Sequence, residues 1–448
     1  MTTFWLEHAV LPTGAVRSGV LVSTDDARGD TIERVETGVP APPAGVSVLR
    51  GLTLPGLANV HSHAFHRALR ARLPDGRGTF WTWRTGMYDI AARLTPATYF
   101  DLARAVFAEM ALTGITAVGE FHYVHHQPDG TPYGDPNEMS AVLVEAAAAA
   151  GIRITLLDTC YLRGGTHEPL QGAQVRFGDG TAEAWAARAD LFAAGLHRPH
   201  AKAGAAIHSV RAVPAIGLPV LAAWARRHDA PLHIHLSEQP AENEACLAEY
   251  GSTPTGLLHQ TDVLGRRTTA VHATHLVRED ILLLGGSGTG VCLCPTTERD
   301  LADGIGPGAA LQAAGSPLSL GSDSHAVIDL FEEARAVETG ERVVTGQRGH
   351  FTPPMLLTAA TVNGHRAIGW DAGRIAVGSR ADLVTVDLDS PRTAGCGVDL
   401  ATAIYAATSA DVTDVVVDGR FVVRHREHAL VKDVPDALRT SIAAVRPS

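Results

Sequence analysis

The sequence predicts a (β/α)8 barrel of the TIM type, accompanied by a small β-sandwich domain built from both termini. Three observations support this prediction. Eight apolar runs alternate with helix-like stretches through the middle of the chain, which is the pattern of βα units around a parallel sheet. Both ends instead carry short β-like segments broken by glycine and proline. Four of the apolar runs carry candidate metal ligands, histidine or aspartate, at or next to their last residue, and barrel active sites are built at strand carboxyl ends.

Residues 1–55 are expected to form the N-terminal part of the small β domain. The segment 46–49 is a short β-like run beside proline-rich sequence. Residues 368–448 have the same texture, with β-like segments at 381–386 and 412–420. We therefore expect the two ends of the chain to combine in one domain.

Residues 56–367 are expected to form the barrel. Helix-like stretches such as 95–112, 138–150 and 214–227 separate its apolar runs. The eight predicted strands are 57–63, 115–122, 152–160, 203–208, 232–236, 269–272, 291–294 and 318–323. Since parallel strands joined by helices run in one direction, their carboxyl ends should meet at one mouth.

Composition and charge narrow the class of protein. The 448 residues are 45% hydrophobic and 19% charged, which is typical of a globular chain with a large core. A formal net charge of −11 argues against nucleic-acid binding, because neutralising phosphates requires lysine and arginine. No apolar stretch reaches the roughly 20 residues of a membrane helix, and the N-terminus does not resemble a signal peptide. Five scattered cysteines without a C-x-x-C pair suggest neither disulfides nor a zinc ribbon, and favour a cytoplasmic location.

Four strand ends carry side chains that bind divalent metals. They are His61 and His63 on the first predicted strand, His235 on the fifth, His272 on the sixth and Asp323 on the eighth. Histidines at positions i and i+2 of a strand point to the same face. One such histidine alone would often be a hydrogen-bonded core residue, but the set favours one metal with a position open for water. Imidazole and carboxylate ligands suit zinc, and iron and manganese accept them too.

A single metal ion is favoured over two. Binuclear barrels of this kind use a modified lysine at the end of the fourth strand. The chain holds only two lysines, Lys202 and Lys432. Lys202 precedes His208 by six residues, which places it about 20 Å along an extended strand from the mouth.

Hydrolysis at such a metal requires proton carriers. A divalent metal lowers the pKa of water toward neutrality, and a base must then take the proton. Asp323 can act as this base while it contacts the metal. Glu238 follows His235 by three residues on the next loop and can carry a proton to a departing nitrogen. His272 can polarise the oxygen that becomes negative. Without this context, Glu238 would often be a solvated loop residue.

Longer motifs are specific enough to indicate a family. They lie at 59–65, 80–84, 120–126, 208–213, 233–239, 271–275, 303–305 and 321–325. On these motifs the chain resembles the amidohydrolase superfamily and, within it, the formimidoylglutamate deiminases of histidine breakdown, over nearly its whole length. The metal motifs mark the superfamily. The more specific segments are Phe-Trp-Thr-Trp-Arg at 80–84, Glu-Phe-His-Tyr-Val-His-His at 120–126 and His-Ser-Val-Arg-Ala-Val at 208–213.

The resemblance implies a hydrolase acting on a C–N bond of a linear amidine. N-Formimidoyl-L-glutamate and water would give N-formyl-L-glutamate and ammonia. It also implies one zinc ion per subunit and a homodimer. The family's metal ligands map onto His61, His63, His235 and Asp323, its proton-handling residues onto Glu238 and His272, and its substrate contacts onto Arg84, Tyr123, His208 and Arg211. His66 stands where the family often has glutamine, and imidazole can also hydrogen-bond a substrate.

An anionic substrate also fits the side chains. The proposed substrate has two carboxylates, for which Arg84 and Arg211 offer planar donors and Tyr123 a hydroxyl, although single arginines often serve only in surface ion pairs. Two other interpretations stay open. One is a superfamily deaminase acting on a purine, a pyrimidine or a nucleoside, whose flat ring would not need two arginines. The other is a metal-binding barrel without catalytic activity.

The sequence does not determine the roles of several other residues. One or two of His122, His125 and His126 are expected to line the pocket. Cys292 and Cys294 are expected to be buried structural residues. The pair Trp81 and Trp83 could line the pocket or pack in the core.

Overall fold

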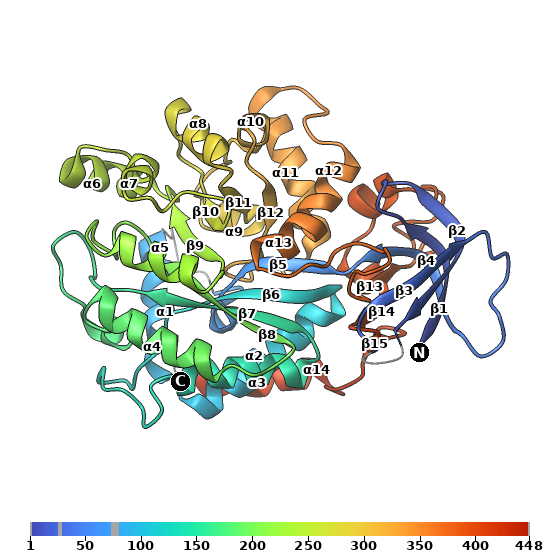
Figure 1. Ribbon diagram of the computed structural model, residues 1–448, viewed down its shortest axis with the longest axis horizontal. Coiled ribbons are helices and arrows are strands. Elements are labelled where there is room, and N and C mark those ends of the chain that lie inside the picture. Colours follow the sequence, from blue (N-terminus) through green and yellow to red (C-terminus); the bar gives the residue numbers. More distant parts are fainter. Residues whose placement is uncertain (1, 26–28, 73–79, 447–448) are drawn as a thin grey trace.

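A computed structural model describes residues 2–25, 29–72 and 80–446 of the chain. They form a barrel of alternating strands and helices and a separate sheet made from both ends of the chain (Figure 1). In the described part, no helix is both long enough and apolar enough to pass through a bilayer.

The barrel sheet contains eight parallel strands in chain order. They are β5 (Leu57–Ser62), β6 (Ile115–His122), β7 (Arg153–Cys160), β8 (Ala201–Ile207), β9 (Leu232–Leu236), β10 (Thr268–His272), β11 (Gly290–Leu293) and β12 (Leu318–Leu320). The first and last strands approach each other through a bridge between Ser62 and Asp323. The backbone N–H of Asp323 donates to the carbonyl of His61 at 3.0 Å. The predicted (β/α)8 barrel is confirmed.

The strands are apolar on both faces because helices cover the outside and side chains fill the inside. Every residue of β6 and β7 is buried. The helices are α1 (Phe80–Arg93), α2 (Pro96–Leu112), α3 (Glu138–Ala150), α4 (Ala182–Gly195), α5 (Leu218–Arg227), α6 (Pro240–Tyr250), α7 (Pro254–Gln260), α8 (Arg278–Ser287), α9 (Pro295–Asp300), α10 (Gly308–Ala314), α11 (Leu330–Thr345), α12 (Pro353–Thr358), α13 (Gly364–Ala367) and α14 (Val434–Val445). Capping residues and prolines mark the first residues of these helices. Thr95, for example, caps α2 in a capping box, and Pro96 opens the helix.

The last barrel strand is shorter than predicted. β12 stops at Leu320, and the chain turns so that Asp323 adopts a φ of 42°. A Cβ atom at Gly321 would lie 2.7 Å from the Cβ of His61. Only glycine therefore lets the eighth strand end pass this close to the first.

The small domain is a mixed sheet of eight strands in the order β16-β15-β14-β13-β4-β1-β2-β3. The strands are β1 (Thr3–Val10), β2 (Val16–Thr24), β3 (Ile32–Thr37), β4 (Ser47–Pro55), β13 (Leu383–Val386), β14 (Val412–Val417), β15 (Arg420–Arg424) and β16 (Glu427–His428). Antiparallel pairing of β4 with β13 joins the two ends of the chain. The sheet curls over a shared core, since the rings of Phe4 and Phe421, from strands separated by three others, lie 5.7 Å apart. Both termini thus build this domain, as predicted.

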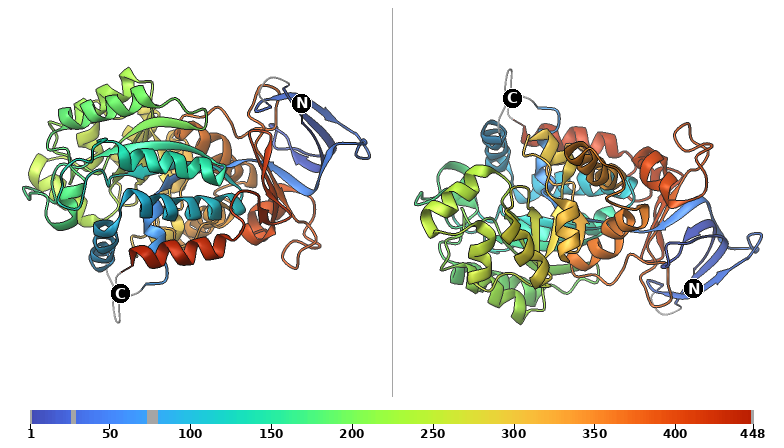
Figure 2. Two further views of the ribbon diagram at one scale, coloured as in Figure 1. Left: turned by 90° about the horizontal axis from the view of Figure 1, so that it is seen from below. Right: turned by 90° about the horizontal axis from the view of Figure 1, so that it is seen from above.

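Side chains at the amino end of the barrel contact the small domain. Trp370 donates through Nε1 to Thr155 at 3.0 Å, and Thr155 donates to the carbonyl of Ile368 at 2.6 Å. Buried Arg153 at the start of β7 pairs with Asp382 and Asp418 of the small domain. Figure 2 shows α14, in red, lying along the barrel, where it packs on α2. The predicted site residues lie at the other end, the carboxyl end of the strands, where barrel active sites are built.

Candidate metal centre and active site

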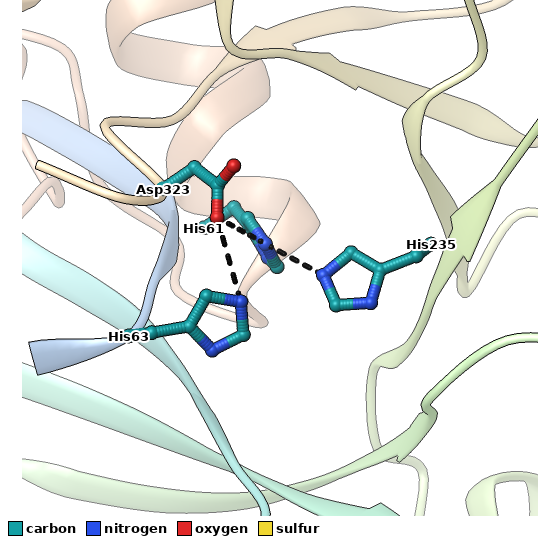
Figure 3. A group of neighbouring side chains, drawn as sticks. All are labelled: His61, His63, His235 and Asp323. Atoms are coloured by element: carbon teal, nitrogen blue, oxygen red, sulfur yellow. Dashed lines mark hydrogen bonds and ion pairs between the residues drawn. The ribbon is translucent and has the colours of Figure 1, made fainter. Parts of the chain in front are cut away.

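Four side chains from three strand ends converge at the carboxyl end of the barrel (Figure 3). They are His61, His63, His235 and Asp323, all buried, with ligand atoms within 4.8 Å of one another. The Oδ1 atom of Asp323 lies 3.3 Å from Nε2 of His61 and 3.4 Å from Nε2 of His63. Nε2 of His235 lies 3.0 Å from Nε2 of His61. The structure thus brings together the four predicted metal ligands.

Hydrogen bonds behind the rings orient two of these ligands. His63 donates from Nδ1 to the carbonyl of Phe121 at 2.8 Å, and His235 donates from Nδ1 to the carbonyl of His208 at 2.9 Å. Each Nε2 then carries its lone pair toward the centre of the cluster. Burial lowers the pKa of His61, His63 and His235, so these rings are neutral, which is the form that binds a metal.

The cluster fits a divalent metal on its own chemistry. The Nε2 lone pair of His235 faces Nε2 of His61 at 3.0 Å, an approach that a shared cation makes favourable. The carboxylate of Asp323 adds a negative charge among the rings. Burial opposes this ionisation, but the hydrogen bond with His61 and the charge of His272 outweigh it and hold the pKa of Asp323 below its usual range. Three imidazoles and one ionised carboxylate form a zinc-type ligand set.

Two further titratable side chains border this cluster. Nε2 of His272 lies 3.8 Å from Oε1 of Glu238 and 3.8 Å from Oδ2 of Asp323. Burial raises the pKa of Glu238, which favours a carboxyl group that carries a proton. Burial opposes the protonation of His272, but the hydrogen bond with Glu298 and the charge of Asp323 outweigh it, and the pKa of His272 is raised. The three predicted proton-handling residues therefore lie side by side.

A pocket opens onto this cluster at the barrel mouth. Its lining residues are His63, His66, Trp83, Arg84, Met87, Tyr88, Tyr123, Tyr161, His208, Arg211, His235, Glu238, His272, Leu301 and Asp323. All five predicted substrate contacts, His66, Arg84, Tyr123, His208 and Arg211, are among them. A larger groove of about 570 Å³ lies at the opposite end of the barrel and contains none of the predicted site residues.

The wall of the pocket carries cationic and hydroxyl donors. Arg84 on α1 donates to the hydroxyl of Tyr161 and to the carbonyl of Gly164, both at 3.3 Å. Nη1 of Arg211 is buried and has no hydrogen-bond partner among the described residues. Nε2 of His66 and the hydroxyl of Tyr123 lie 2.8 Å apart. The pocket therefore combines arginine donors with a metal-ligand cluster.

Sequence reasoning missed four lining residues: Met87, Tyr88, Tyr161 and Leu301. Tyr88 follows Arg84 by four residues on α1, so helical spacing places both on one face. Tyr161 comes directly after β7 and could have been found from the rule that strand carboxyl ends build the site. Leu301 lies just beyond α9 and had no comparable signal.

The histidines at 122, 125 and 126 do not line the pocket, so that expectation was wrong. The cause is strand alternation. Phe121 points into the barrel toward His61, so its neighbour His122 points outward. His125 donates to the carbonyl of Thr159 at 2.9 Å and His126 lies 3.3 Å from Asp179.

The structure also shows the surroundings of other residues that the sequence analysis discussed. Cys292 and Cys294 are buried with sulfur atoms 4.0 Å apart. The ring of Trp83 lies 5.0 Å from that of His66, whereas the side chain of Trp81 is outside the described part. Lys202 hydrogen-bonds the carbonyl of Gly369 at the amino end, where it cannot bridge two metals at the mouth.

Comparisons with known proteins agree with this geometry. The model of the amidohydrolase family matches residues 52–422. A Pseudomonas aeruginosa protein named formimidoylglutamate deiminase is 38% identical, over 96% of each chain. A crystal structure of an amidohydrolase from Brucella melitensis is 31% identical and superposes with a TM-score of 0.89 over 99% of this chain and 100% of that one. A structure described as an adenosine deaminase from Xanthomonas campestris with bound zinc is 25% identical, with a TM-score of 0.86 over 99% and 97% of the two chains.

Proposed function

This chain belongs to the amidohydrolase family, and on that premise we propose that it hydrolyses N-formimidoyl-L-glutamate to N-formyl-L-glutamate and ammonia. One observation carries the proposal. A single pocket holds a metal-ligand cluster with Glu238 at its edge, together with the two arginines Arg84 and Arg211. Only a substrate with both a hydrolysable C–N group and carboxylates uses all of these groups. The 38% identity to a protein named formimidoylglutamate deiminase supports the same choice.

The proposal includes one zinc ion per subunit, held by His61, His63, His235 and Asp323. When bound there, zinc would act as a Lewis acid that lowers the pKa of water and polarises the substrate. It also includes a homodimer and a place in histidine degradation, both of which come from the resemblance to the deiminases.

The chain's own residues would handle the protons. Ionised Asp323 takes a proton from the attacking water as its oxygen bonds to the formimidoyl carbon, and His272 hydrogen-bonds the oxygen. Glu238, whose pKa is raised by burial, gives its proton to the nitrogen of the imino group. The bond between carbon and that nitrogen breaks, ammonia leaves, and the hydroxyl proton returns to Glu238 as the carbonyl forms. Because the bound amidine is a cation, the proton on Asp323 is released at the end.

The substrate's carboxylates would be held by the arginines. Arg211 lines the pocket and its Nη1 has no hydrogen-bond partner in the described part of the chain, and a guanidinium can donate two parallel hydrogen bonds to a carboxylate. Arg84 is supported by Tyr161. Tyr123, His66 and His208 line the same wall. A purine, a pyrimidine or a nucleoside would bring no carboxylate to Nη1 of Arg211, which is buried without a hydrogen-bond partner among the described residues, and an unsatisfied buried donor is costly.

An ammonia-release assay tests this proposal. The zinc-loaded protein is expected to release ammonia from N-formimidoyl-L-glutamate with kcat/KM at least about 100-fold above that for guanine, 8-oxoguanine, cytosine or adenosine, since losing charge-assisted contacts costs about 1.5–3 kcal/mol each. An Asp323→Asn sample prepared in parallel controls for contaminating deaminases. A ring substrate turned over faster would replace the proposed substrate, and no ammonia from any compound would favour a non-catalytic metal-binding barrel.

A further inference from the structure

Glu298 lies behind His272 and does not line the pocket. Its Oε1 atom is 3.4 Å from Nδ1 of His272 and within hydrogen-bonding geometry. The other ring nitrogen, Nε2, faces Glu238 and Asp323, at 3.8 Å from each. The two nitrogens of His272 therefore have separate partners, one outside the pocket and one inside.

The carboxylate of Glu298 is itself held in place. Glu298 follows the end of β11 on the short helix α9, where its backbone N–H donates to the carbonyl of Cys294 at 3.0 Å. The backbone N–H of Cys294 donates in turn to Oε1 at 2.8 Å. Glu298 is 3% exposed, and a buried carboxylate is unfavourable unless it is hydrogen-bonded. The same oxygen thus accepts from a fixed backbone donor and from His272.

The backbone at His272 is strained as well. His272 and Ala273 have φ angles of 68° and 52°, in the left-handed region that costs non-glycine residues of order 1–3 kcal/mol each. The N–H of Ala273 donates to the carbonyl of Leu236 at 3.0 Å, which holds this turn against β9. Such strain at a strand end is the kind of outlier from which a functional constraint is inferred.

A second metal ion is the other use that these atoms allow, because ligand atoms of His272, Cys294 and Glu298 lie within 4.8 Å of one another. The chemistry disfavours it. Burial and the neighbouring Cys292 raise the pKa of Cys294 well above its usual value, so the side chain is a thiol and not the metal-binding thiolate. Oε1 of Glu298 is already occupied by two donors.

We propose that Glu298 is a positioning residue that accepts a hydrogen bond from the Nδ1–H group of His272 and aims Nε2 into the pocket. This inference rests on the proposed role of His272 in the hydrolysis. A residue of this kind acts through its partner, and replacing the corresponding partners of metal-binding histidines typically changes activity by about 10- to 100-fold.

Two conservative variants separate position from charge. Glu298→Asp keeps the charge but shortens the side chain by one methylene, so the carboxylate no longer reaches Nδ1 of His272. Glu298→Gln removes the charge but keeps the reach, and the N–H of Cys294 fixes which end of the amide faces His272. We expect kcat to fall about 10- to 100-fold in Glu298→Asp and to stay within about 3-fold of wild type in Glu298→Gln, with KM and zinc content unchanged in both. In a His272→Ala background neither change should lower kcat further, because residues acting through one another are non-additive.

A second readout does not depend on turnover. In ¹⁵N-histidine spectra of the zinc-loaded protein, with His272 assigned from His272→Ala, a protonated Nδ1 is expected in wild type and Glu298→Gln and not in Glu298→Asp. Equal kcat in Glu298→Asp and wild type, equal losses in both variants, or an unprotonated Nδ1 in wild type would overturn the role of Glu298. A wild type that releases no ammonia contradicts the proposed function instead, and the spectra still decide the role of Glu298.

Discussion

Replacement of Asp323 by asparagine is expected to lower kcat for ammonia release by about 10³-fold or more, since positioned proton transfer contributes about 10²–10⁴-fold. Asp323 sits within 3.4 Å of two ligand histidines and 3.8 Å of His272. Its carboxylate stays ionised because the surrounding imidazoles outweigh the effect of burial on its pKa. Asparagine has the same shape but cannot accept the proton of water. Steady-state ammonia release, with circular dichroism to verify the fold, measures the effect.

The dual role of Asp323 requires two controls. Asparagine is also a weaker metal ligand, so zinc content is measured and kcat is repeated with excess zinc. Asp371→Asn makes the same chemical change at an exposed site and should leave kcat unchanged. If zinc-loaded Asp323→Asn retained more than a tenth of the wild-type kcat, Asp323 would not be the base.

Replacement of Arg153 by methionine is expected to destabilise the protein by about 3–5 kcal/mol, the usual effect of removing one partner from a buried ion pair. Arg153 is fully buried at the amino end of β7 and donates to Asp382 at 2.9 Å and to Asp418 at 2.8 Å. Methionine would leave the carboxylate of Asp382 buried without its counter-charge. Urea unfolding followed by circular dichroism measures the loss. Arg374→Met breaks an exposed pair and should cost below about 1 kcal/mol.

The effect of Arg153→Met should also depend on pH. Burial opposes the ionisation of Asp382, but the charge and hydrogen bonds of Arg153 outweigh it and lower its pKa. Ionised Asp382 therefore contributes stability above its unfolded-state pKa of about 3.9, and this contribution is lost as pH falls through the lower folded-state value. In Arg153→Met the pKa of Asp382 rises, and the carboxyl can be neutralised at a higher pH. The stability gap between wild type and variant should shrink from pH 7 to pH 4, and a constant gap would mean that the ion pair is not its source.

The sequence was sufficient to predict positions where a metal-binding side chain stands at the end of an apolar run. The ligands His61, His63, His235 and Asp323 all end apolar runs, and barrel geometry brings strand ends together. Backbone turns that change the direction of a side chain beyond a strand end are harder to predict from the sequence. Asp323 reaches the cluster through a left-handed backbone beyond a strand of three residues, which no alternating pattern indicates.

Residues that act from loops and helices are harder to predict still. Leu301 enters the pocket and Glu298 lies behind it only because α9 follows β11 closely. Strand alternation also placed His122 on the outside of the barrel, although it ends β6 as the ligands end their strands. Position at a strand end predicts a site only for the side chains that face inward.

Restoring zinc to chelated protein while following ammonia release from N-formimidoyl-L-glutamate tests the central claim most directly. A single site made of three imidazoles and one carboxylate predicts no turnover in the metal-free protein, then a linear rise in rate that breaks at one equivalent of zinc per chain. Full turnover without added metal, a break at two equivalents, or no ammonia at any zinc level would contradict it.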